Sequence, residues 1–165
     1  MRWLCRAVLL ACLTTPLWAL PGDQDQPIQI EADRLQMDEV NRVSRYFGNV
    51  TIVQGSIQFE GDSIAVYFNQ NDELDLLEIK GRPARFKQLN ADGKPVSASA
   101  RLLRYFEADA RLELRGDALF RSEDDQIQSD SINLFTQNDA IEAGSPEGDS
   151  RVRMLIQPNK RTIDE

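Results

Sequence analysis

The chain has 165 residues, a length that suits one domain, and its 27 acidic and 19 basic side chains give it a net charge of −8. It has no histidine, and both of its cysteines lie within the first twelve residues. The acidic balance argues against nucleic-acid partners, whose phosphates must be neutralised by cationic side chains. The lack of histidine removes the commonest general base and most zinc sites, so we expect no metal and no cofactor.

Residues 1–19 have the pattern of a secretory signal peptide, with a positively charged start, a short apolar run and the small residue Ala19 at a cleavage position. We expect cleavage after Ala19 and export to the periplasm. The exported part, residues 20–165, is predicted to be a single domain with a frayed tail from about residue 157. Lipidation at Cys12 is a weaker alternative, because a cut before that residue would leave almost no apolar core.

Beyond this leader, apolar and polar residues alternate with a period of two, which is typical of half-buried β-strands. Glycine, asparagine and aspartate interrupt the alternation at short intervals, as they do in turns. Alternating segments are predicted, in chain order, at residues 28–30, 50–52, 57–59, 64–68, 74–79, 84–86, 103–105, 112–114, 132–134 and 152–156. Many short strands without helical periodicity indicate an all-β sandwich, jelly roll or barrel.

The sequence also contains a weak internal repeat. Residues 48–67 align without a gap with residues 116–135, and identical residues recur along this alignment. The identical pairs include Gly48 with Gly116, Gln58 with Gln126, Asp62 with Asp130, Ser63 with Ser131 and Ile64 with Ile132. We therefore predict two copies of one β unit stacked in a single body.

The apolar members of the alternating segments share one face, which we predict to line the interior. The candidate lining residues are Ile28, Ile30, Leu35, Phe47, Val50, Ile52, Ile57, Phe59, Ile64, Val66, Phe68, Phe86, Leu103, Tyr105, Leu112, Leu114, Ile132, Leu134, Met154 and Ile156. By itself the alternation favours an ordinary packed core over a lining that binds a ligand.

Carboxylates cluster at residues 23–25, 72–75 and 123–125. A glycosidase needs two carboxylates a few ångströms apart, one of them with a raised pKa. These clusters lie in predicted turns or at polar strand positions, where solvated surface is the expected role, and the first two do not complete the ligand pattern of a calcium loop. A secreted hydrolase is therefore the least favoured function.

Three motifs follow one another in the first half, namely Gly-Asn-Val-Thr-Ile-Val-Gln-Gly at 48–55, Gly-Asp-Ser-Ile at 61–64 and Gly-Arg-Pro-Ala-Arg-Phe at 81–86. Residues 114–118 and 127–132 echo the first two motifs. Over about residues 26–156, this pattern resembles the OstA-like domain family of periplasmic lipopolysaccharide transport proteins. The departures are mild, with Gly61 where alanine is usual and Asp117 where asparagine is usual.

The resemblance implies a twisted, incompletely closed antiparallel β jelly roll, built here from two repeat halves, with an apolar interior that holds the acyl chains of lipid A. It implies a carrier without catalytic activity that passes lipopolysaccharide from the inner to the outer membrane. The implied partners are lipopolysaccharide, further copies of the chain joined head to tail, an inner-membrane-anchored OstA-like protein (LptC-like) and an outer-membrane assembly protein (LptD-like).

An open jelly roll leaves a strand edge free at each end, and we expect the segment after Pro27 and the segment before Pro158 to supply these edges. Four arginines could meet lipid phosphates, although exposure to solvent is their simpler role: Arg82, Arg85, Arg151 and Arg153. Two alternatives remain open. One is a structural β filament or adhesin module with a dry core, and the other is the membrane-anchored member of the same pathway.

Overall fold

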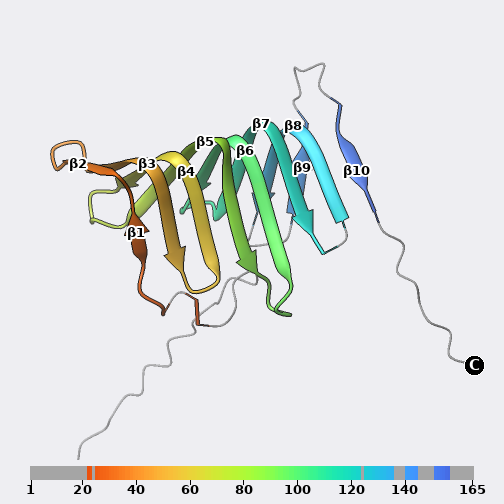
Figure 1. Cartoon of the computed structure of the whole chain (residues 1–165), viewed down its shortest axis with the longest axis horizontal. Coiled ribbons are helices and arrows are strands. Elements are labelled where there is room, and N and C mark those ends of the chain that lie inside the picture. The colour runs from red at the N-terminus through yellow and green to blue at the C-terminus, as the bar shows by residue number, and fades with distance from the viewer. Residues whose placement is uncertain (1–21, 24, 124, 136–139, 145–150, 157–165) are drawn as a thin grey trace, which may run out of the picture.

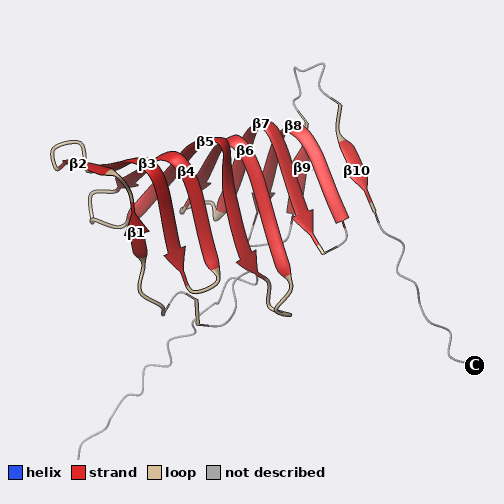
Figure 2. Ribbon diagram, in the orientation of Figure 1, coloured by secondary structure: helices blue, strands red, loops and turns tan. Residues whose placement is uncertain are grey.

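The structure is a computed structural model that describes residues 22–23, 25–123, 125–135, 140–144 and 151–156. The predicted signal peptide, the lipidation alternative at Cys12 and the predicted frayed tail lie outside the described residues. The strands are β1 (Gln29–Glu31), β2 (Arg34–Asp38), β3 (Val43–Gln54), β4 (Ile57–Phe68), β5 (Leu74–Leu89), β6 (Pro95–Phe106), β7 (Arg111–Ser122), β8 (Asp125–Phe135), β9 (Ala140–Ala143) and β10 (Arg153–Leu155). The described residues contain no helix (Figure 2).

All the strands belong to one antiparallel sheet, in the order β1-β3-β4-β5-β6-β7-β8-β10, with β2 also paired to β3 and β9 also paired to β8. The sheet is folded across its strands into two layers (Figure 1). We call the half that carries β1 and β10 the front layer and the half that carries β2 and β9 the rear layer. The first and last strands do not pair with each other, so the sheet is open, which confirms the predicted incompletely closed all-β fold.

The two layers meet along a line of irregular pairing, which we call the spine. Five successive strand pairs, from β3–β4 to β7–β8, shift register where they cross it. Gly48 and Gly116 lie on the spine with φ values of 77° and 76°, and each is followed by a second residue with positive φ, Asn49 or Asp117. The sequence pattern predicted turns here. The structure instead places bulges inside continuous strands, because pairing with the neighbouring strand shifts at each glycine and then resumes in the same direction.

The register confirms the internal repeat. Phe47 pairs with Ser63 in the first half, and Arg115 pairs with Ser131 at the same offset in the second. The shifts at the spine coincide as well, because Val50 resumes the pairing in β3 and its equivalent Ala118 resumes it in β7. In this arrangement β6 corresponds to β1 and β2 joined, and β5 corresponds to β10 and β9 joined.

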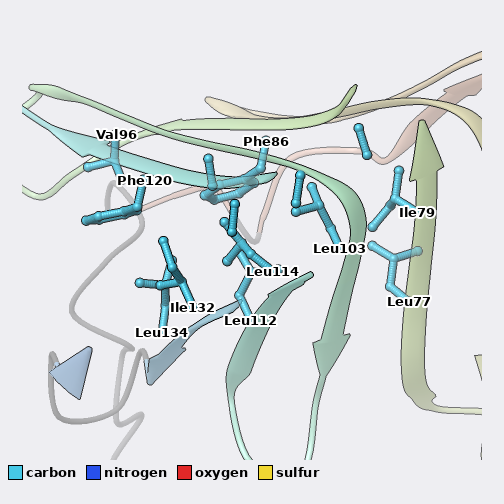
Figure 3. Close-up of a cluster of buried hydrophobic side chains, with 14 of the residues drawn as sticks. Leu77, Ile79, Phe86, Val96, Leu103, Leu112, Leu114, Phe120, Ile132 and Leu134 are labelled. Carbon is cyan, nitrogen blue, oxygen red and sulfur yellow. The ribbon is translucent and has the colours of Figure 1, made fainter. Parts of the chain in front are cut away.

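The hydrophobic core fills the space between the layers (Figure 3). Its side chains come from alternate positions of each strand, so the period of two places one face of each layer against the other. Ile79, Leu103, Leu114 and Ile132 are 0% exposed and lie side by side across the middle strands of the rear layer. The opposite positions of the same strands carry many of the charged side chains.

Candidate functional site

The apolar interior extends without a break from one free edge of the sheet to the other. One row of paired residues crosses the front layer: Ile30, Ile52, Phe59, Phe86, Ala98, Phe120, Ile127 and Met154. A second row crosses the rear layer: Leu35, Tyr46, Ile64, Ile79, Leu103, Leu114, Ile132 and Ala143. We call these the front row and the rear row. Both rows face the space between the layers, so together they form a continuous apolar lining.

The interior is packed more tightly in its second half than in its first. Leu112, Phe120 and Leu134 are at most 4% exposed, and they belong to β7 and β8. The partly buried residues that pack against the core come mostly from β3 and β4, and they include Ile57 and Phe59. The Phe59 ring lies 5.0 Å from the Phe86 ring, centroid to centroid, at an interplanar angle of 37°. The looser lining is therefore on β3 and β4.

Both ends of the interior expose apolar side chains. At the β1–β2 edge, Ile28 is 61% exposed and Met37 is 66% exposed. At the β9–β10 edge, Met154 is 58% exposed and Ile156 is 61% exposed. Exposed apolar side chains that gather at one edge are typical of surfaces that contact another molecule.

A hollow of about 450 Å³ opens at the β2 end, and a second of about 330 Å³ opens at the β10 end. The residues that line the first include Met37, Asp38, Arg42, Ser44 and Phe68. The second is lined by Asp117, Gln128, Ser129, Asp130, Arg151 and Arg153. Among the described residues, the buried hydroxyl oxygen of Ser129, which lines this hollow, has no hydrogen-bond partner.

The outer face of the rear layer is held together by ion pairs. Arg104 lies between two acids, with its Nε 3.3 Å from Glu78 Oε2 and its Nη1 3.5 Å from Glu113 Oε2. Arg115 also donates to Glu113, at 2.6 Å from Nη2 to Oε1. The side chain of Glu113 is only 7% exposed, so two guanidinium groups neutralise a largely buried carboxylate.

Phe47 corrects the predicted lining. Its register partners are Arg34 and Ser63, on the face opposite to the rear row, and the guanidinium carbon of Arg34 lies 4.3 Å from its ring centroid. The inward residue is its neighbour Tyr46, which pairs with Ile64. The prediction followed the apolar character of Phe47 and missed that a cation can cover an aromatic face on the outside of a sheet.

The structure divides the remaining predicted lining residues into three groups. Buried in the core are Val50, Ile52, Ile64, Phe86, Leu103, Leu112, Leu114, Ile132 and Leu134. Partly buried against it are Ile57, Phe59, Val66 and Tyr105. Exposed at the edges or at the hollow near β2 are Ile28, Ile30, Leu35, Phe68, Met154 and Ile156.

Sequence reasoning missed Tyr46, Phe120 and Ile127, which all contribute to the rows. The internal repeat was the available signal, because these residues are the equivalents of Leu114, Ile52 and Phe59. The four arginines do not form one cluster. Arg85 and Arg153 occupy the same outer row but lie four strands apart, about 19 Å at the usual strand spacing.

Two equivalent contacts at the spine explain a departure from the usual motif. In the first half, Asn49 Nδ2 donates to Asp33 Oδ2 at 3.0 Å. The residue equivalent to Asp33 in the second half is Arg101, and its Nε lies 3.4 Å from Asp117 Oδ2. Aspartate therefore stands in the asparagine position because its neighbour has changed from an anion to a cation.

The acidic cluster near the start of the described chain has a structural role. The Asp23 side chain accepts hydrogen bonds from the backbone nitrogen of Ser56, at 2.8 Å, and from its hydroxyl, at 2.6 Å. Ser56 Oγ in turn accepts from the backbone nitrogen of Leu89 at 3.1 Å. Asp23 thus joins the N-terminal segment to the β3–β4 turn and to the end of β5. The described residues contain no group of three or more potential metal ligands.

Comparison with known proteins agrees with this architecture. Residues 29–140 match the family model described as "LptA/(LptD N-terminal domain) LPS transport protein". The chain belongs to the LptA/LptD N-terminal domain family. The lipopolysaccharide export system protein LptA of Escherichia coli K12 is 31% identical over 152 residues, which cover 92% of this chain and 82% of that protein. The export protein LptH of Pseudomonas aeruginosa is 30% identical over 150 residues, which cover 87% of this chain and 86% of that protein.

A solved structure of LptH from P. aeruginosa superimposes on this member of the family with a TM-score of 0.75 and 28% sequence identity. It covers 84% of this chain and all of the LptH chain, and it is described as the LptA-homologous periplasmic component of the lipopolysaccharide transport device. Among the residues described here, no helix is long and apolar enough to cross a membrane.

Proposed function

We propose that this family member is a periplasmic carrier, without catalytic activity, that transfers lipopolysaccharide from the inner to the outer membrane. The observation that supports this function is the unbroken apolar lining, whose front and rear rows run through every long strand and whose front row ends in an exposed side chain at both edges. A closed globular core has no need of apolar ends in water.

The energetics of the cargo explain why such a lining is needed. Keeping an acyl chain of about ten methylenes in water costs roughly 8 kcal/mol, at about 0.8 kcal/mol per methylene. A carrier must therefore offer apolar contact along the whole route. The charged headgroup of the lipid remains in solvent, where salt screens its repulsion from the acidic protein.

Within the lining, the acyl chains would pack against the looser part on β3 and β4. Phe59 and Ile57 are partly exposed there, whereas the side chains of the rear row in β7 and β8 are fully buried. The hollow beside Met37 extends this region to the β2 edge. Lipid tails can therefore reach apolar surface without opening the tightly packed half.

The bridge across the periplasm would consist of several copies joined head to tail, with an LptC-like protein at the inner membrane and an LptD-like protein at the outer membrane. One copy of eight successive strands is only about 40 Å long at the usual strand spacing. The free edges of the sheet provide backbone donors and acceptors for such contacts.

Site-specific photo-crosslinking in living cells tests the carrier function. A photoreactive residue at Phe59 should capture lipopolysaccharide, because the Phe59 side chain faces the looser lining. The matched position Gln58 is its immediate neighbour and alternates to the outer face, so it should give several-fold less adduct. Equal labelling at the two positions would mean that the lipid does not lie between the layers.

A structural β module with a dry core is the competing function, and the complete burial of Ile79, Leu103 and Leu114 favours it. The same experiment separates the two. A dry module would give no lipid adduct at Phe59 or at Ile132, whereas a carrier whose layers separate fully would give adducts at both.

A further inference from the structure

The junction between β5 and β6 is the place where the first repeat of the chain meets the second. Across it, Arg85 pairs with Ser99, Phe86 with Ala98 and Gln88 with Val96. Because the two halves share their register, this junction shows how one repeat unit is followed by the next. The strand pairing of this junction can therefore be extended past the last strand, β10.

At the end of the second repeat, the position of β5 is taken by β10. Its register against β8 repeats that of β5 against β4, since Phe59 pairs with Phe86 and the equivalent Ile127 pairs with Met154. Likewise β1 is the equivalent of the first half of β6, because Ile30 pairs with Ile52 as Ala98 pairs with Phe120. The free edge at β10 thus corresponds to the β5 side of the internal junction, and the free edge at β1 corresponds to its β6 side.

We infer that a second copy docks its β1 on β10 in the register of the β5–β6 junction, with Arg153 opposite Glu31 and Met154 opposite Ile30. This inference rests on the head-to-tail assembly in the proposed function and specifies its contact. In this register, Ile156 meets Ile28 and Val152 meets Ala32. The spine and the interior of one copy continue into those of the next.

The side chains at the two edges are complementary in this register. Arg153 and Glu31 lie on the outer face and carry opposite charges, and no ion pair involving either of them is observed among the described residues. Met154 and Ile156 face inward, as do Ile30 and Ile28, so each exposed apolar group gains an apolar neighbour. Cross-strand pairs of both kinds stabilise antiparallel sheets.

The rear layer supports the same register. Ala143 of β9 pairs with Ile132 and so takes the place that Ile79 has beside Ile64. Ile79 pairs with Leu103 and Leu77 with Tyr105, so the second copy would bring Leu35 opposite Ala143 and Met37 opposite Ile141. The junction then covers eight of the eleven exposed large hydrophobic residues among the described ones: Ile28, Ile30, Leu35, Met37, Ile141, Val152, Met154 and Ile156.

Disulfide trapping tests the register, since beyond Cys12 the chain has no cysteine. Full-length chains carrying Ile30→Cys and Met154→Cys are produced separately, exported, mixed and oxidised, with the parent chain as the blank. Directly opposite residues have Cα atoms about 4.5–5.5 Å apart, within the range of a disulfide. The diagonal combination of Ile28→Cys with Met154→Cys, at about 7–8 Å, is the matched control and should trap at least several-fold less.

Charge reversal provides an independent readout. Glu31→Arg and Arg153→Glu should each weaken self-association roughly two- to fivefold, and a chain carrying both reversals should recover it. Two outcomes would overturn the register: preferential trapping of the diagonal pair, or charge reversals that have no effect on intact oligomers. Neither outcome would contradict head-to-tail assembly itself. Folded parent protein that shows no self-association at any concentration would overturn both, whereas lipid capture at Phe59 remains a separate measurement.

Discussion

At the scale of single residues, Tyr105 is the group whose ionisation is coupled most clearly to the interior. It pairs with Leu77 and Leu112 on the inward face of β6, next to the core. Burial there raises the pKa of the Tyr105 hydroxyl to about 12, and the negative charge of Glu107 and a hydrogen bond to it add to the effect. The neutral phenol is therefore favoured in the folded protein.

We predict that alkaline pH destabilises the protein through this residue. Because the folded pKa is raised, the contribution is complete below about pH 10 and is lost as the pH rises towards 12. Wild type should lose roughly 1 kcal/mol of unfolding free energy more than Tyr105→Phe across this interval, because solvent screens part of the effect at this half-buried group. Urea unfolding at pH 9 and at pH 12 measures the difference. Tyr67→Phe, which retains Tyr105, is the matched control, and an equal loss in the wild type and in Tyr105→Phe would contradict the prediction.

Single residues also show where sequence reasoning succeeds and where it stops. Alternation correctly places Phe59 and Ile132 inside and their neighbours Gln58 and Asn133 outside. It fails at Phe47, because an apolar residue next to a bulge has no fixed side until the register is known. The repeat would have settled the side, since the equivalent of Phe47 is the outward-facing cation Arg115.

At the scale of elements, the decisive feature is a bend within a strand. Gly48 has a φ of 77°, and a Cβ atom at this position would collide with the side chain of Asp33. Gly93 has a φ of 74° in the β5–β6 turn, where a Cβ atom would meet nothing within 4 Å. The two glycines thus differ in steric crowding and not in backbone conformation.

We predict that Gly48→Ala destabilises the fold more than Gly93→Ala. Both replacements place a Cβ in the left-handed region, at a cost of about 1–2 kcal/mol. Only Gly48→Ala must also displace Asp33 from its hydrogen bond with Asn49, which should add roughly 1 kcal/mol. Chemical denaturation of the two variants measures the difference, and equal midpoints would show that the Asp33 contact contributes nothing.

Most of the strands could be predicted from the sequence, but no alternating segment was predicted over β2 or β9, and the folding of the sheet could not be predicted. Within β3, period-two alternation is predicted only after Gly48, and residues 43–47 give no sign that they belong to the same strand. The change of layer depends on several bulges aligning across neighbouring strands, which is a property of register. The displacement of β9 relative to the register expected from the repeat could not be predicted from the sequence either. By the repeat, residue 147 should pair with Ile132, whereas Ala143 does so.

At the scale of the whole molecule, the two free edges of the sheet are the surfaces through which the fold can contact another protein. Strand β10 pairs with β8 through only three residues, and its apolar side chains are mostly in water. It therefore contributes little to the stability of a single copy, while it forms half of the free edge. A change at β10 is therefore expected to affect assembly without unfolding the monomer.

We predict that deleting residues 151–165 abolishes concentration-dependent oligomers and leaves the monomer folded. The matched control deletes residues 157–165 alone, which retains β10 and should retain self-association. Sedimentation velocity measures the assembly state of both variants, and circular dichroism measures their fold. Oligomers that persist after the longer deletion would show that the edge formed by β10 is not the contact surface.

The division of each edge into two short strands has a consequence for the choice of partner. Neither β1 nor β10, with three residues each, offers enough backbone for a stable contact on its own. A partner must engage both layers at once, so that binding to one short strand raises the effective concentration for the other. A single flat strand from an unfolded or aggregating chain can satisfy only one of the two. We therefore expect the split edge to favour partners that are folded into the same two layers.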